Sequence, residues 1–72
     1  FNPYAFTAAH RTLPIGSILL VSNPENGKKV VVRVNDRGPR SKNREIDLSL
    51  AAAKAIGIQQ AGVDEVTIEV IE

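Results

Sequence analysis

The chain has 72 residues, which is enough for one small domain. Hydrophobic residues make up 43% of it and the net charge is +1, so the composition excludes a disordered chain and gives no general attraction to nucleic acid or to a membrane surface. There is no cysteine, which excludes disulfides, zinc–thiolate sites and cysteine nucleophiles, and no apolar run approaches membrane-spanning length.

The first half of the sequence predicts short strands separated by turns. Residues 6–10 are compatible with a short strand, and the apolar run "SILLVS" at 17–22 is typical of a buried one. Asn26-Gly27 lies between two apolar runs and predicts a hairpin. In the return strand, residues 28–35, alternate positions on one face are valines, namely Val30, Val32 and Val34.

The second half predicts a helix and a final strand. We expect "IDLSLAAAKAIG" to form the helix, with Asp47 or Ser49 as its N-cap and Gly57 at its end. Residues 63–71 alternate apolar and polar side chains, which is typical of a half-buried strand. Several short strands with one short helix indicate a mainly β fold, a small β-barrel.

Asp36 is the first candidate for chemistry, because it ends the valine strand in "VVVRVNDRGP". If the strand stays extended for one more residue, Asp36 lies on the valine face. A carboxylate at the rim of an apolar face loses solvation, which favours its protonated form and suits a general acid. The alternative is that Asp36 accepts backbone N–H bonds in the Asp-x-Gly turn.

Other polar residues have a structural interpretation beside the functional one. His10 is the only histidine, and it is predicted either to orient a substrate hydroxyl or to bond to the backbone as a partly buried side chain. We interpret Asp47 as a helix cap. No metal site or other cofactor is expected, since a lone histidine has no second ligand at a suitable spacing. The basic residues between positions 33 and 44 suit a solvated loop or a groove for an anionic polymer; they are Arg33, Arg37, Arg40, Lys42 and Arg44.

Four segments in this order carry a family resemblance: "TAAHRTLPIG", "VVVRVNDRGP", "REIDLSLAAAKAIG" and "VDEVTIEVIE". Together they closely resemble the rare lipoprotein A family of double-psi β-barrel domains, over nearly the whole of residues 1–72. The resemblance implies a six-stranded type of barrel. Relatives begin with an additional strand that carries an acidic groove residue, so we expect this chain to be N-terminally truncated.

The resemblance also implies a function. It implies a lytic transglycosylase of the cell envelope (periplasmic, outer-membrane lipoprotein or secreted) that cleaves peptidoglycan glycan strands lacking stem peptides. Asp36 is then the acid/base and His10 lines the same groove, while Thr7, Arg37 and Arg44 are candidates for binding substrate. One carboxyl suffices in principle, because the C6 hydroxyl of the sugar attacks in place of water. A non-catalytic, expansin-like glycan-binding module is the main alternative, and a module that binds envelope or division proteins is another.

Overall fold

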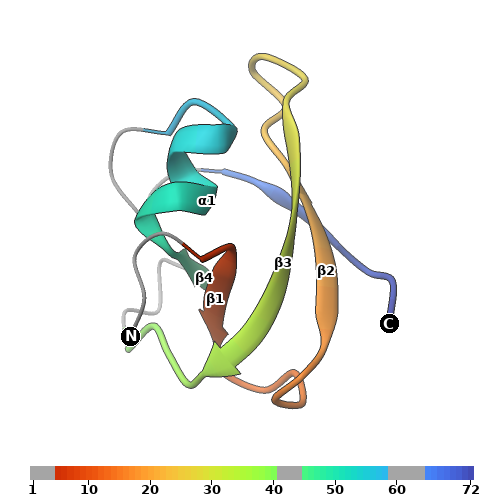
Figure 1. The fold of residues 1–72 in the computed structure, drawn as a ribbon, viewed down its shortest axis with the longest axis vertical. Helices are drawn as coiled ribbons and strands as arrows, with labels where there is room; N and C mark the ends of the chain where they lie inside the picture. Colours follow the sequence, from red (N-terminus) through yellow and green to blue (C-terminus); the bar gives the residue numbers. More distant parts are fainter. Residues whose placement is uncertain (1–4, 41–44, 59–64) are drawn as a thin grey trace.

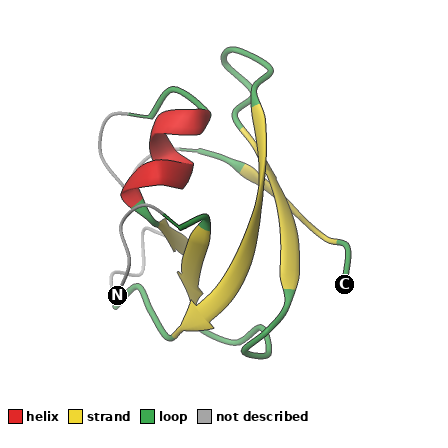
Figure 2. Cartoon of the chain, viewed as in Figure 1, coloured by secondary structure: helices red, strands yellow, loops and turns green. Residues whose placement is uncertain are grey.

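The computed structural model describes residues 5–40, 45–58 and 65–72. Over these residues the chain forms five strands and one short helix (Figures 1 and 2). In chain order the elements are β1 (Thr7–His10), β2 (Ile18–Ser22), β3 (Lys29–Asp36), β4 (Ile46–Leu48), α1 (Leu50–Ala55) and β5 (Thr67–Val70). No helix in the described part of the chain is long and apolar enough to cross a membrane.

The strands form one sheet in the order β4-β1-β3-β2-β5. β2 and β3 pair as an antiparallel hairpin, and they form the long twisted ribbon in Figure 1. β1 runs parallel to β3 on one side and antiparallel to β4 on the other. The helix α1 packs against β3 and β4. This curled sheet with one short helix confirms the mainly β class that the sequence predicts.

The core lies between the curled sheet and α1. Along β3 buried and exposed residues alternate from Lys29 to Val34, so the valine face predicted from the sequence is confirmed. The largest fully buried side chains come from β2, β3 and the end of α1: Leu19, Val21, Val32, Val34 and Ile56. Fully burying such a side chain contributes about 1.5–3 kcal/mol. This packing fixes β1, β3 and β4, and with them the positions of their ends.

The start of the helix differs from the prediction. Ser49 is the N-cap of α1, and its side chain accepts a hydrogen bond from the backbone N–H of Ala52. Residues Ile46–Leu48, which we expected to open the helix, form β4 instead. Asp47 therefore lies inside a strand, and its interpretation as a helix cap is wrong. The predicted end is confirmed, because Gly57 follows α1 with φ +77°.

The final strand is shorter than the predicted 63–71. It spans Thr67–Val70 and pairs with β2, while residues 63 and 64 lie outside the described residues. Val66 and Ile68 are half-buried as the alternation predicts. Val70 is 53% exposed, because β5 is an edge strand and the core ends before this position.

Candidate functional site

The end of β3 carries an irregularity that decides where Asp36 points. Ala8 of β1 pairs with Val34, but the next residue, Ala9, pairs with Asp36, so Asn35 is an extra residue in β3. A bulge of this kind turns the side chains beyond it to a new direction. Asn35 and Asp36 are both exposed. The expectation that Asp36 continues the valine face and loses solvation is therefore wrong.

The Asp36 carboxylate is held at its base by the backbone. The N–H of Arg37 donates a hydrogen bond of 2.7 Å to Oδ1 of Asp36. This is the type of contact that the turn interpretation predicts. It does not exclude chemistry, because the contact occupies one oxygen and the carboxylate as a whole stays accessible to a ligand.

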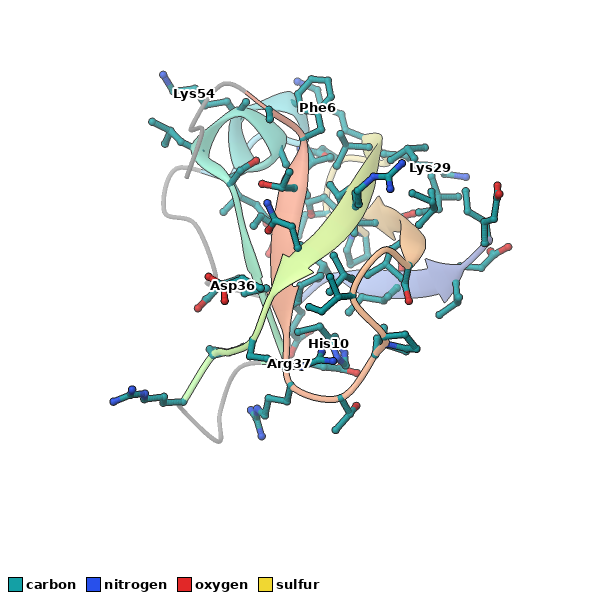
Figure 3. The ribbon with its side chains drawn as sticks, turned by 60° about the horizontal axis from the view of Figure 1, so that its bottom comes forward. Phe6, His10, Lys29, Asp36, Arg37 and Lys54 are labelled. Atoms are coloured by element: carbon teal, nitrogen blue, oxygen red, sulfur yellow. The ribbon has the colours of Figure 1, made fainter. Side chains whose placement is uncertain are left out.

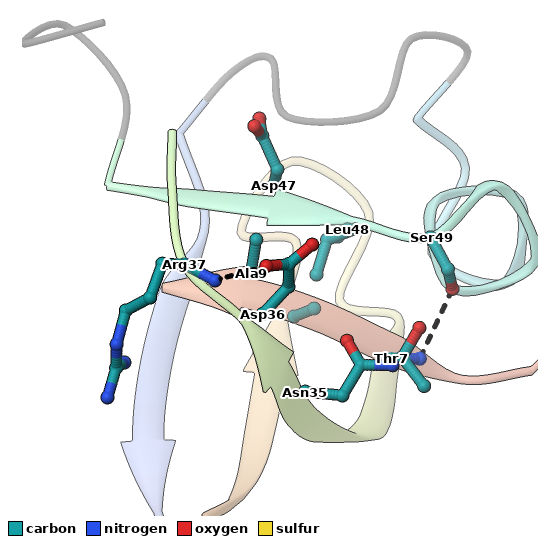
Figure 4. A pocket seen from close by; sticks show the side chains of 9 residues that line it. Thr7, Ala9, Asn35, Asp36, Arg37, Asp47, Leu48 and Ser49 are labelled. Atoms are coloured by element: carbon teal, nitrogen blue, oxygen red, sulfur yellow. Dashed lines mark hydrogen bonds between the residues drawn. The ribbon is translucent and has the colours of Figure 1, made fainter. Parts of the chain in front are cut away.

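A second carboxylate belongs to the same region. Ala9 is the register partner of Asp36 in β3 and also of Asp47 in β4. Neighbouring strands lie about 4.8 Å apart, so the Cα atoms of the two aspartates are about 10 Å apart, one on each side of Ala9. Paired residues on adjacent strands share a face of the sheet. Figure 4 shows both carboxylates on the same side of the sheet.

Both aspartates line a pocket of about 240 Å³. Its floor is formed by β1, with the small side chain of Ala9 between the two carboxylates (Figure 4). Asp47 is half-buried, and its Oδ1 atom has almost no exposed surface. The remaining lining residues are Thr7, Ala8, Asn35, Arg37, Leu48 and Ser49. The pocket thus combines two carboxylates with hydroxyl and amide groups, which suits a ligand rich in hydroxyls.

Sequence reasoning missed Asp47 as a site residue. A signal was present: Ile46 and Leu48 are both apolar and alternate with Asp47, as in a short strand. Since Ile46 and Leu48 face the core, Asp47 has to face the other side.

Ser49 fixes the wall of the pocket next to the helix. Its Oγ accepts hydrogen bonds from the backbone N–H groups of Thr7 and Ala52 and donates one of 2.6 Å to the carbonyl of Ala5. The backbone N–H of Ser49 also donates to the carbonyl of Thr7. Thr7, a predicted substrate ligand, lines the pocket. Its strand is hydrogen-bonded to Ser49, the N-cap of α1.

His10 is buried in β1 and does not line the pocket. Burial alternates along β1, and His10 is buried on the same side as Ala8. Its Nδ1 accepts hydrogen bonds from the backbone N–H groups of Thr12 and Leu13. This matches the interpretation of a buried histidine bonded to the backbone. His10 is not among the residues lining this pocket, and its place in the glycan groove, which the family resemblance implies, stays a prediction.

The other predicted site residues divide between the pocket and its surroundings. Arg37 lines the pocket, but Nη1 of its guanidinium donates to the carbonyls of His10 and Leu13. Arg44 lies outside the described residues. Within residues 5–40, 45–58 and 65–72, no group of three or more His, Asp or Glu side chains is arranged to hold a metal ion.

Comparison with known proteins gives one consistent result. A family model described as "Lytic transglycolase" matches residues 1–68. The chain is 59% identical over 71 residues to the "Endolytic peptidoglycan transglycosylase RlpA" of Vibrio cholerae, covering 99% of this chain and 27% of that protein. It is 57% identical over 68 residues to the "Probable endolytic peptidoglycan transglycosylase RlpA" of Treponema pallidum, covering 94% of this chain and 21% of that protein. It is 56% identical over 71 residues to the "Endolytic peptidoglycan transglycosylase RlpA" of Haemophilus influenzae, covering 99% of this chain and 25% of that protein. The chain thus spans about a quarter of the length of these relatives.

Proposed function

Because the chain belongs to the lytic transglycolase family of double-psi β-barrel domains, we propose that it is the catalytic domain of a peptidoglycan lytic transglycosylase of the cell envelope. The observation that supports this best is the pocket with Asp36 at its mouth and Asp47 on the other side of Ala9. We further propose a preference for glycan strands without stem peptides, which parallel assays on bare and peptide-bearing strands test.

In the proposed reaction, Asp36 is the acid and then the base. Its protonated carboxyl donates a proton to the glycosidic oxygen while the bond from that oxygen to C1 breaks. The C6 hydroxyl of the same sugar attacks C1, and its proton passes to the Asp36 carboxylate. The products are two shorter strands. One carries the released hydroxyl, and the other ends in a 1,6-anhydro sugar. No water is consumed, and Asp36 regains its starting protonation state.

Asp47 has an electrostatic role in this proposal. Positive charge develops at C1 in an oxocarbenium-like transition state. A carboxylate already fixed in the pocket stabilises that charge without having to reorganise. Asp47 suits this role because it lies in a paired strand and is half-buried, whereas Asp36 is exposed and accessible to the leaving oxygen.

Asp36→Asn tests the proposal. Asparagine can still accept the hydrogen bond from the N–H of Arg37, so the bulge should keep its shape. It cannot donate an acidic proton, so we expect release of anhydro-sugar ends from purified glycan strands to fall by about 10²–10⁴-fold. Melting temperature and binding of glycan strands should stay unchanged. Glu69→Gln is the matched control, since Glu69 is an exposed carboxylate on the edge strand β5.

The same assay tests the glycan-binding alternative. The exposure of Asp36 supports that alternative, because the carboxyl lacks the desolvation that would favour its acid form. Wild-type protein that binds glycan strands but releases no anhydro-sugar ends would establish a binding module and reject the transglycosylase. Turnover by Asp36→Asn equal to wild type would remove Asp36 from the reaction.

A further inference from the structure

Arg37 follows the proposed catalytic residue and borders the pocket, yet its guanidinium is bonded to carbonyls of His10 and Leu13, which do not line the pocket. In Figure 4 the Arg37 side chain runs away from the Asp36 carboxylate, and in Figure 3 it lies beside His10. The sequence predicts Arg37 as a substrate ligand. The hydrogen bonds of the guanidinium favour a different role.

The guanidinium of Arg37 joins two elements that are far apart in the sequence. Its Nη1 donates to the carbonyl of His10 at 3.1 Å and also to the carbonyl of Leu13. These carbonyls bracket residues 10–13, the segment that leaves the end of β1. Arg37 itself follows directly after the last residue of β3. The side chain therefore links the end of β3 to the chain leaving β1.

Hydrogen bonds within the segment 10–13 hold its backbone in one conformation. Nδ1 of His10 accepts from the backbone N–H groups of Thr12 and Leu13, at 3.2 Å and 3.1 Å. The carbonyls of His10 and Leu13, at the two ends of the same segment, accept from the guanidinium. The buried ring of His10 thus binds N–H groups of the segment, and the exposed side chain of Arg37 binds its carbonyls.

The same link reaches the Asp36 carboxylate. The backbone N–H of Arg37 donates to Oδ1 of Asp36, so the position of the Arg37 backbone sets the direction of the carboxylate. Asp36 is exposed and follows a bulge, so packing alone does little to hold it. An exposed acid needs such fixed contacts, because a displacement of about 1 Å in a reacting group can cost about 10²-fold in rate.

We propose that Arg37 is a positioning residue, which acts through the segment 10–13 and its own N–H to aim the Asp36 carboxylate, and that it is not a ligand of the glycan. The kinetic part of this proposal rests on the proposed function. Arginine suits the role better than lysine, because its planar guanidinium holds a fixed geometry and is less strongly hydrated than an ammonium group.

The test compares Arg37→Gln, Arg37→Lys and Arg40→Gln in the protein that carries this domain. Arg40 is an exposed arginine of the same loop and serves as the control for lost charge. We expect Arg37→Gln to lower kcat for anhydro-sugar release by about 10–100-fold, with KM within about twofold of wild type. The kcat of Arg37→Lys should lie between those of Arg37→Gln and wild type, and the kcat of Arg40→Gln should match that of wild type. A raised KM with unchanged kcat would overturn the proposal and return Arg37 to the substrate ligands.

A second measurement does not depend on activity. Amide hydrogen exchange at Thr12 and Leu13 should be faster in Arg37→Gln than in wild type, partly slowed again in Arg37→Lys, and unchanged in Arg40→Gln. Equal exchange in all four proteins would show that the guanidinium does not hold the segment, and would reject the proposal whatever the kinetics. If wild type releases no anhydro sugar, the proposed function fails, and the exchange result still decides on the link. If Arg37→Gln does not fold, the comparison of Arg37→Lys with wild type decides it.

Discussion

Gly57 and Gly27 offer a controlled test of how the end of the helix is held. The two glycines have nearly the same left-handed backbone, with φ of +77° and +74°. At Gly57 an added Cβ would lie 2.7 Å from Nδ2 of Asn26, whereas at Gly27 it would meet nothing within 4 Å. Alanine at each position therefore adds the same backbone strain, but only Gly57→Ala also displaces a side chain.

The expected costs follow from these contacts. A left-handed non-glycine residue costs about 1–2 kcal/mol, so Gly27→Ala should lower the free energy of unfolding by that amount. At Gly57 the displaced amide of Asn26 also loses its 3.1 Å hydrogen bond to the carbonyl of Ile56, which adds about 1 kcal/mol. The carbonyl keeps its bond from Asn23, which limits the loss. Gly57→Ala should therefore cost about 2–3 kcal/mol, or about 8–24 °C in melting temperature for a domain of this size.

Urea denaturation of the single variants and of a double variant decides the matter. In an Asn26→Ala background the clash is absent, so Gly57→Ala should there cost no more than Gly27→Ala does in wild type. Equal costs for Gly57→Ala and Gly27→Ala in the wild-type background would refute the reasoning, because they would show that the contact with Asn26 carries no energy.

Three further variants test the site. Ser49→Ala should lower the free energy of unfolding by about 2–3 kcal/mol, because it removes the N-cap and leaves the N–H of Thr7 without its bond; a loss below about 0.5 kcal/mol in urea denaturation would contradict this. Asp47→Asn should slow anhydro-sugar release by about 10²-fold while glycan binding persists, and wild-type turnover would exclude the electrostatic role. Ala9→Leu should fill the pocket floor between the carboxylates, so glycan binding measured by sedimentation with insoluble strands should fall, whereas Ala9→Ser should bind as wild type; normal binding by Ala9→Leu would show that the glycan lies elsewhere.

The elements that the sequence predicts correctly are those encoded locally. The alternating valines of β3 and the apolar run of β2 specify their own strands. Asn26-Gly27 lies in the connection of residues 23–28 between them, where the N–H of Gly27 donates to the carbonyl of Asn23. The end of α1 is local too. After Gly57 adopts its left-handed conformation, the N–H of Ile58 bonds to the carbonyl of Ala53 and the N–H of Gly57 to that of Lys54, which closes the helix within six residues.

β4 is predicted as the start of the helix, because the partner strand that makes it a strand lies elsewhere in the chain. It is a strand of three residues, Ile46–Leu48, directly before a helix cap, and three residues give too short a pattern to separate a strand from a helix start. It exists because β1 offers an edge to pair with. The interpretation of Asp47 as a cap followed from reading β4 as helix.

The site itself arises where two such non-local features meet. The bulge at Asn35 is a mismatch of register between β3 and β1, and the alternation within β3 contains no sign of it. Through this mismatch Asp36 leaves the valine face and becomes the partner of Ala9, and through the pairing of β4 Asp47 becomes the partner of the same residue. The sequence therefore identifies Asp36 by its place at a strand end, but the pairing of β1 determines which face it occupies and which second carboxylate it shares. The small side chain of Ala9 leaves the space between the two carboxylates open, so the "TAAH" strand can form the floor of the pocket.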